Sequence, residues 1–226
     1  MISLKHIEKV FQVGEEKVQA LHDVTFGAEK GEYIAIMGPS GSGKSTLLNI
    51  IGLLDRPDKG IYELDHIKTT TLNERAQADV RRHKIGFVFQ FFHLVPRLTA
   101  AQNIGLPLVL AGIEKGERDK RVLEALEDFG IRDRASHRPD QLSGGQRQRV
   151  AIARATIMKP SVILADEPSG NLDRASGGDV VEILEELNRN GITLLMVTHD
   201  PELGSRAKRR IMMVDGRIVE DTGTSA

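Results

Sequence analysis

Nine residues in the first quarter of the chain have the types and spacing of a phosphate-binding loop. They read Gly38-Pro39-Ser40-Gly41-Ser42-Gly43-Lys44-Ser45-Thr46, which fits the pattern G-x-x-x-x-G-K-[ST]. The glycines let the backbone curl so that successive N–H groups face one anion, and Lys44 adds a positive charge for the β- and γ-phosphates. The Ser45 hydroxyl is placed to bind Mg²⁺. We therefore expect all nine residues to bind a nucleoside triphosphate together with Mg²⁺.

A strand before this loop and a helix after it are required before the pattern can be accepted. Residues 33–37 form a short apolar run that is partly β-branched and typical of a buried strand. Residues 47–51 are mainly leucine and isoleucine and favour a helix, whose N-terminus would add its positive dipole end to the loop. A glycine-rich loop that fits by chance is the alternative, and both flanks argue against it.

Two acids and a histidine end the next two runs that read as buried strands. Residues 161–167 end in Asp166 and Glu167, and residues 192–198 end at His199. Asp166 would lie near the phosphates and hold the Mg²⁺ shell, while Glu167 would polarise an attacking water. A single histidine is usually structural, but the place of His199 at the same sheet edge favours a contact with the γ-phosphate.

A second anion-binding cradle is indicated by Leu142-Ser143-Gly144-Gly145-Gln146, which opens a helix predicted over residues 145–158. The cradle consists of one hydroxyl group, two glycines with open N–H groups and a helix N-terminus. The same residues would also serve as an ordinary helix cap, so their chemistry alone leaves both interpretations open.

At this point the sequence resembles the nucleotide-binding subunits of ATP-binding cassette (ABC) transporters, because LSGGQ over residues 142–146 matches the family's signature motif. The resemblance covers roughly residues 2–220, and the other motifs follow in the family's order. It implies the Walker A loop at Lys44, the Q-loop at Gln90, Walker B at Asp166-Glu167, the D-loop at residues 169–173 and the switch histidine at His199.

The resemblance also implies a role for each of these residues. Hydrolysis of ATP would depend on Glu167, His199 and Lys44, and Mg²⁺ would be bound by Ser45, Gln90 and Asp166. Besides the nine loop residues, the nucleotide would be bound by Phe11, Gln90, Ser143, Gly144, Gly145, Gln146 and Asp173. From its position alone, Phe11 is favoured as a core residue, but in the family it matches the aromatic residue that stacks on adenine.

A narrower resemblance, over residues 88–96 and 163–173, is to the lipoprotein-release and macrolide-exporter ATPase group. Ser169 departs from the threonine expected there, which is a conservative change. The resemblance implies an ATPase that drives export or extraction through a separate membrane subunit. The alternative is an ABC ATPase that regulates a cell-division or cell-wall hydrolase complex by transmitting force without transport. A soluble cassette of DNA repair or translation is disfavoured, because the chain has neither a second cassette nor a long coiled-coil insertion.

Two partners follow from the resemblance. Two copies of the chain would bind two ATP molecules head-to-tail, each site being shared between the Walker A loop of one copy and the signature motif of the other. An integral membrane permease would dock between Phe91 and Leu98, since Phe92, Leu94 and Val95 are too apolar for an ordinary solvated loop. Packing of these side chains inside a helical subdomain is the alternative. Such a subunit would be cytoplasmic, and peripheral on the inner face of the cell membrane.

The composition narrows the class of protein further. The chain has 31 Lys+Arg and 32 Asp+Glu, for a formal net charge of −1, so we expect no nucleic-acid partner. It has no cysteine, hence no disulfide framework. The first five residues lack the apolar stretch of a signal peptide, and glycine and proline break the apolar run at residues 104–113. Another chain would therefore supply any membrane-spanning part.

We predict one α/β domain over residues 1–226 with the fold of a P-loop NTPase. Apolar strands that alternate with helices predict a mostly parallel central sheet. A RecA-like core would comprise residues 1–90 and 160–226, and an inserted helical subdomain that carries the signature motif would comprise about 91–159.

Smaller features complete this expectation. Residues 2–26 predict an antiparallel β layer with a turn at 14–16, and the polar stretch 57–84 predicts a turn followed by a helix after Thr69–Thr71. Amphipathic helices are expected over residues 117–129 and 179–189. Asp-Gly in the middle of residues 211–220 predicts a hairpin with a type I′ turn.

Overall fold

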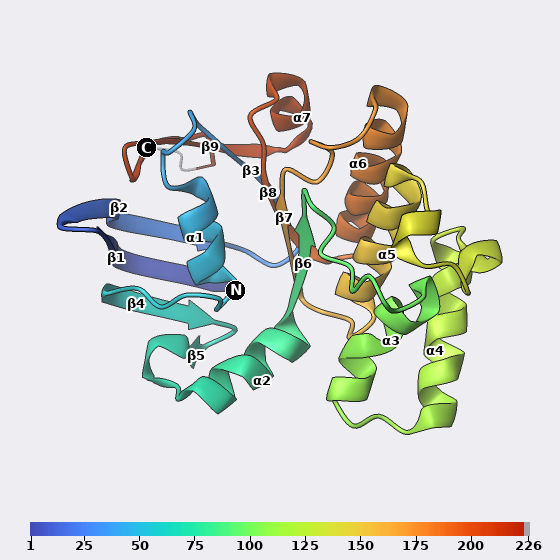
Figure 1. Cartoon of the computed structure of the whole chain (residues 1–226). Coiled ribbons are helices and arrows are strands. Elements are labelled where there is room, and N and C mark those ends of the chain that lie inside the picture. The colour runs from blue at the N-terminus through green and yellow to red at the C-terminus, as the bar shows by residue number, and fades with distance from the viewer. Residues whose placement is uncertain (224–226) are drawn as a thin grey trace.

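Short apolar runs of the sequence form a six-stranded central sheet (Figure 1). The structure is a computed structural model that describes residues 1–223, and the strand order is β10-β9-β3-β8-β7-β6. The parallel strands are β3 (Tyr33–Met37), β6 (Ile85–Phe89), β7 (Val162–Asp166), β8 (Thr193–Val197) and β9 (Arg209–Val214). Strands β3, β7 and β8 are buried on both faces, as expected for a parallel sheet that is covered on both sides.

The first face of this sheet is covered by α1 and the second by α5 and α6. Leu47, Leu48 and Ile51 of α1 (Lys44–Ile51) share a core with Ile34 and Ile36 of β3. Helices α5 (Gly144–Thr156) and α6 (Arg174–Arg189) pack against the alternate side chains of the same strands. The predicted helices there are confirmed, although α6 begins before residue 179 because Asp173 caps it.

A second, antiparallel sheet has the order β2-β1-β4-β5 and consists of β1 (Ile2–Val13), β2 (Glu16–Ala28), β4 (Lys59–Leu64) and β5 (Ile67–Lys68). Its β1–β2 hairpin confirms the predicted antiparallel layer. The sequence did not predict β4 and β5, because only Tyr62 and Leu64 are buried in β4, and the strand owes its existence to pairing with β1. Figure 1 shows α1 between the two sheets, and one core cluster joins them.

The remaining helices lie beside the central sheet (Figure 1). Helix α2 (Glu74–Lys84) follows the short 3₁₀ turn at Thr69–Thr71, as predicted, and α4 (Lys115–Asp128) matches the predicted amphipathic helix. Helix α3 (Ala100–Leu110) was missed because Gly105 and Pro107 interrupt the pattern. Helices α3, α4 and α5 share a third core cluster.

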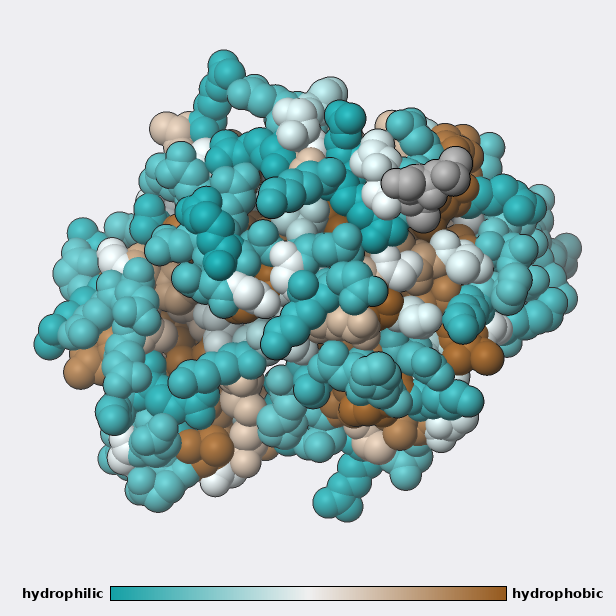
Figure 2. Space-filling view, turned by 180° about the vertical axis from the view of Figure 1, so that it is seen from behind, coloured by the Kyte–Doolittle hydropathy of each residue, from teal (hydrophilic) through white to brown (hydrophobic). Residues whose placement is uncertain are grey.

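The C-terminal hairpin pairs β9 with β10 (Arg217–Asp221), and α7 (Pro201–Arg206) precedes it. Asp215 and Gly216 have φ angles of 45° and 73°, which confirms the predicted type I′ turn. Within residues 1–223, no helix is both long and apolar enough to cross a bilayer. The face shown in Figure 2 is mainly hydrophilic, with its hydrophobic residues in small separate areas. These observations confirm the predicted fold class: a mostly parallel α/β sheet with a separate antiparallel N-terminal sheet.

Candidate functional site

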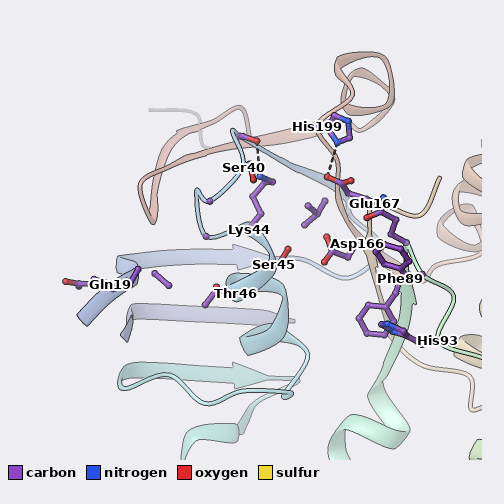
Figure 3. A pocket seen from close by; sticks show the side chains of 18 residues that line it. Gln19, Ser40, Lys44, Ser45, Thr46, Phe89, His93, Asp166, Glu167 and His199 are labelled. Atoms are coloured by element: carbon purple, nitrogen blue, oxygen red, sulfur yellow. Dashed lines mark hydrogen bonds and ion pairs between the residues drawn. The ribbon is translucent and has the colours of Figure 1, made fainter. Parts of the chain in front are cut away.

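The predicted phosphate loop, both acids and the histidine meet in one cleft of about 650 Å³ at the carboxyl ends of β3, β7 and β8 (Figure 3). Of the residues predicted from the sequence, the cleft is lined by Gly38, Ser40, Gly41, Gly43, Lys44, Ser45, Thr46, Gln90, Asp166, Glu167 and His199. Pro39 and Ser42 complete the loop without lining the cleft. The carboxyl ends of parallel strands are the usual place for a ligand in an open α/β sheet.

Lys44 is the first residue of α1, and its ammonium group is held inside the loop. Lys44 Nζ donates to the carbonyl oxygens of Gly38, at 2.9 Å, and Pro39, at 2.7 Å. A buried ammonium group needs such acceptors, because burial without a partner is costly. The loop therefore has a cation at its centre before any phosphate is present. Phosphate oxygens would take the place of these carbonyl oxygens.

Two glycines of the loop cannot carry a side chain. Gly38 has a φ of 144°, and a Cβ there would lie 2.1 Å from the carbonyl oxygen of Met213 in β9. Gly43, the N-cap of α1, has a φ of 95°, and its Cβ would lie 2.5 Å from the carbonyl oxygen of Ala20 in β2. Both angles fall in the region that favours glycine. The backbones of β2 and β9 thus pack closely against the loop backbone and stabilise its curved conformation.

The donor set for a divalent cation is present beside the loop. Asp166 ends β7, and the Ser45 hydroxyl and the Lys44 ammonium lie close enough to influence its ionisation. Burial raises the pKa of the Asp166 carboxyl above its usual value, the Ser45 hydrogen bond opposes that shift, and Glu167 adds to it. With Gln90, these residues offer one hydroxyl, one amide and one carboxylate oxygen, which suit Mg²⁺ when phosphates supply other ligands. No group of three or more His, Cys, Asp or Glu side chains in residues 1–223 could hold a metal ion.

Glu167 and His199 form a pair across the end of the sheet (Figure 3). His199 Nδ1 lies 2.9 Å from Glu167 Oε1, and Glu167 adopts a left-handed φ of 46°. The backbone N–H of Glu167 donates to the carbonyl oxygen of Val197 in β8, at 3.0 Å, which fixes this unusual turn. A strained non-glycine residue that its surroundings hold in place is common at functional sites. The carboxylate and imidazole are therefore oriented together toward the cleft.

Gln90 follows β6 and is fixed by Asn171. Gln90 Nε2 donates to Asn171 Oδ1 at 3.4 Å, and Asn171 Nδ2 donates to the Gln90 carbonyl oxygen at 3.1 Å. A Cβ at Gly170 would lie 2.7 Å from Gln90 Nε2, so the backbone at Gly170 passes close to this side-chain amide. The contact to Asn171 uses the amide nitrogen and leaves Gln90 Oε1 for a cation.

The signature residues lie outside this cleft. Ser143 Oγ accepts a hydrogen bond from the Gln146 N–H at 3.3 Å, and Gln146 Oε1 accepts one from the Ser143 N–H at 3.0 Å. This capping box shows that the helix-cap interpretation is correct for an isolated copy. The hydroxyl hydrogen of Ser143 is not used by the cap, and the N–H groups of Gly144 and Gly145 have no acceptor within the helix. The capping box therefore leaves these donor groups free of the cap's own hydrogen bonds.

Asp173 and Phe11 also lie outside the cleft. Asp173 caps α6 by accepting from the Ser176 N–H at 3.0 Å, and this bond lowers the pKa of its carboxyl. Phe11 is directly opposite Val18 in the β1–β2 ladder, and Val18 lines the cleft. Since opposite residues of an antiparallel pair share a face, Phe11 stands at the rim of the cleft.

Several lining residues were not found from the sequence: Val18, Gln19, Ala20, Phe89, Phe91, His93 and Val197. The β2 residues have no local signal, because only the packing of the antiparallel sheet beside α1 brings them to the loop. Phe89, Phe91 and His93 flank Gln90 in the sequence. Their position next to this predicted site residue is the only sequence feature that could have indicated them. Phe89 and His93 have ring centroids 4.6 Å apart.

A glycine-rich loop that opens a helix, with acids and a histidine at the ends of neighbouring parallel strands, defines a P-loop nucleoside triphosphatase. Residues 21–170 match the family described as ABC transporter. The uncharacterized ABC transporter ATP-binding protein YvrO of Bacillus subtilis is 50% identical over 221 residues, which cover 98% of this chain and 96% of that protein. The chain therefore belongs to the ABC transporter family and is its ATP-binding, ATP-hydrolysing component.

Two further similarities are informative. The macrolide export ATP-binding/permease protein MacB 2 of Aeromonas hydrophila is 50% identical over 99% of this chain, which spans 34% of that longer protein. A solved dimeric structure of the cassette MJ0796 has a TM-score of 0.91 and 45% sequence identity over 100% of both chains. A second MJ0796 structure, a dimer in a post-hydrolysis state bound to ADP and Pi, has the same TM-score and 44% identity over 100% of both chains.

Proposed function

We propose that the chain is the ATPase of an exporter or extractor in which a separate membrane subunit carries the substrate pathway. The observation that carries this proposal is the joint placement of Lys44, Glu167 and His199 in one cleft. The export type is supported by the likeness to a macrolide export protein that joins an ATP-binding part to a permease. Such an ATPase would lie on the inner face of the cell membrane.

The chemistry would proceed with ATP bound in the cleft. Lys44 and the loop N–H groups would bind the β- and γ-phosphates, and Ser45, Gln90 and Asp166 would hold Mg²⁺, which would supply positive charge beside the phosphates. Glu167 accepts a hydrogen bond from the attacking water and orients it in line with the γ-phosphate. His199, held by Glu167, donates toward the γ-phosphate oxygens.

Two copies would close around two ATP molecules. The signature residues lie outside the cleft of their own copy, yet they offer one hydroxyl hydrogen, two N–H groups and the positive end of α5. A second copy in head-to-tail orientation would place this cradle, with Asp173 beside it, against the triphosphate that the first copy binds. The two solved dimers of the similar cassette support this arrangement.

We propose that the membrane subunit binds at a groove beside the segment of residues 91–98. The groove, of about 450 Å³, is lined mainly by Phe87, Phe89, Leu106, Pro107, Leu110 and Met158, between β6, α3 and α5. None of residues 91–98 lines this groove, although Phe91, Phe92, Leu94 and Val95 were expected to form the docking surface. Phe91 lines the nucleotide cleft instead, and Leu94 packs against the core of α3, α4 and α5. Residues of about 91–159 would act as a helical subdomain, which contributes Leu106, Pro107, Leu110 and Met158 to the groove, while β6 of the core contributes Phe87 and Phe89.

Regulation of a cell-wall hydrolase by force, without transport, is the second candidate. It would use the same ATPase site and the same groove, so the identity of the membrane subunit distinguishes the two functions. Co-purification of the chain with its membrane partner, followed by identification of that partner, separates them.

The ATP-driven dimer is tested with Glu167→Gln, which keeps the shape of the side chain but removes its charge. Gel filtration with Mg²⁺ and ATP should give a stable dimer, since the closed state cannot hydrolyse its ATP. The wild type in ADP is the control and should elute as a monomer. A variant that binds ATP and still elutes as a monomer would falsify the shared-site proposal.

A further inference from the structure

Lys9 is a buried lysine of β1, two residues before Phe11. Its side chain is 10% exposed, and Lys9 Nζ donates to Asp55 Oδ1 and to the Arg56 carbonyl oxygen, both at 2.8 Å. Asp58 Oδ1 lies 4.0 Å away. These partners belong to the segment that joins α1 to β4, so the ammonium group has a fixed position.

The same ammonium group covers one face of the Phe11 ring. Lys9 Nζ lies over that ring, 5.1 Å from its centroid. Phe11 is 38% exposed, although it is a large apolar residue, and it stands opposite Val18 at the rim of the cleft. The ring therefore has a cation over one face, and Phe11 keeps 38% of its surface exposed beside Val18, which lines the cleft.

We propose that Lys9 is a positioning residue for the base of the nucleotide: it holds the Phe11 ring so that its open face receives a purine. The inference rests on the proposed ATPase function and on the stacking of adenine on Phe11 that the resemblance to ABC ATPases implies. A cation is attracted to the face of an aromatic ring, and a nucleobase stacks on the face of an aromatic side chain. A ring that is already ordered loses less freedom when the base arrives, so base binding becomes more favourable.

A purely structural role for Lys9 makes a different prediction. Asp55, Arg56 and Asp58 follow α1, whose first residue is Lys44, so a tie from β1 to this segment could support the phosphate loop. Loss of such a tie would weaken binding of the triphosphate, whether or not a base is attached. The two roles are separated by comparing ligands with and without a base.

The experiment measures dissociation constants for Mg²⁺–ATP and for Mg²⁺–tripolyphosphate, which has the phosphates but no base. For Lys9→Met, ATP should bind about three- to tenfold more weakly, while tripolyphosphate should bind as to the wild type. Lys9→Arg keeps the cation and should restore most of the ATP affinity. Phe11→Ala should weaken ATP at least as much, and Lys9→Met should add nothing in that background.

Lys59→Met is the matched control, because it removes a neighbouring lysine whose exposed ion pair with Glu8, at 2.9 Å, touches no aromatic ring. Both ligands should bind it normally. Asp55→Asn keeps Lys9 but weakens its anchor, and it should lower ATP affinity in the same direction. This second variant serves if Lys9→Met does not fold.

The outcomes are distinct. The positioning role is overturned if Lys9→Met loses the same affinity for ATP and for tripolyphosphate, or if it loses no affinity for ATP. If Phe11→Ala binds ATP normally, the placement of adenine itself is wrong and the inference fails with it. If Phe11→Ala is weakened and Lys9→Met is not, the placement of adenine stands and the role of Lys9 alone is rejected.

Discussion

Lys44 is the residue on which binding of the triphosphate should depend most. Its ammonium group is already held by two loop carbonyls, so Lys44→Ala removes the charge without disturbing α1 beyond its first turn. We expect ATP affinity to fall by roughly 10- to 100-fold, since hydrogen bonds to charged groups contribute about 1.5–3 kcal/mol each. Titration with a fluorescent ATP analogue measures this. Lys115→Ala, at the exposed start of α4, is the control, and equal affinities in both variants would contradict the assignment.

The ion pair between Arg209 and Asp221 makes stability depend on pH. Asp221 Oδ2 accepts from Arg209 Nη2 at 2.6 Å, and this bond lowers the pKa of the Asp221 carboxyl below its usual value. An acid with a lowered pKa stabilises the fold fully above its ordinary value of 3.8, and the contribution is lost as pH falls from there. Asp221→Asn should therefore lower the melting temperature by more at pH 7 than at pH 3, where part of the contribution is already lost. A uniform loss at both pH values would count against the pair.

At the scale of elements, Arg154 joins α5 to the segment after Gln90. Its guanidinium donates to the carbonyl oxygens of Phe92, at 2.9 Å, and His93, at 2.6 Å. Both residues have left-handed φ angles, 53° and 47°, which cost free energy unless they are held. Helix α5 is thereby tied to the segment that follows Gln90.

Arg154→Met should release this tie. We expect faster amide hydrogen exchange in residues 91–98 and a stability loss of about 2–3 kcal/mol, because two charge-assisted hydrogen bonds disappear. Arg97→Met removes an exposed arginine in the same segment and should leave exchange unchanged. Exchange rates that do not differ between the two variants would refute the tie.

At the scale of the whole molecule, the groove between β6, α3 and α5 should bind the membrane subunit. Leu110 lines it with 65% of its surface exposed. Leu110→Asp should leave the melting temperature and basal ATP hydrolysis unchanged, while co-purification with the membrane subunit falls by tenfold or more, since a buried unpaired charge is costly at an interface. Leu123→Asp, on the exposed side of α4, is the control. Normal recruitment by Leu110→Asp would exclude the groove.

The central sheet was predictable because its strands are continuous apolar runs that require burial on both faces. Strand β4 was not, since its pairing with β1 decides its conformation and its own pattern has only two buried residues. Helix α3 could have been found from Thr99 and Gln102, which form a capping box, but Pro107 weakened the helical pattern.

For the site, the sequence predicted residues from their chemical type, such as Lys44, Asp166 and Glu167, and the structure brings these three together in one cleft. It could not predict Gln19 or Ala20, because these line the cleft through their place in β2 and not through their chemistry. It also could not show that Ser143 caps α5, since cap and cradle use the same residues. Distinguishing the two needed coordinates for the hydrogen-bond partners.

One core cluster contains buried residues from both sheets and from α1, the helix that begins at the phosphate loop. The antiparallel sheet therefore has no separate interior that would let it melt while the central sheet stays folded. The two sheets form one cooperative unit with α1 at its centre. A ligand bound at the first turn of that helix should therefore raise the unfolding free energy of both sheets together.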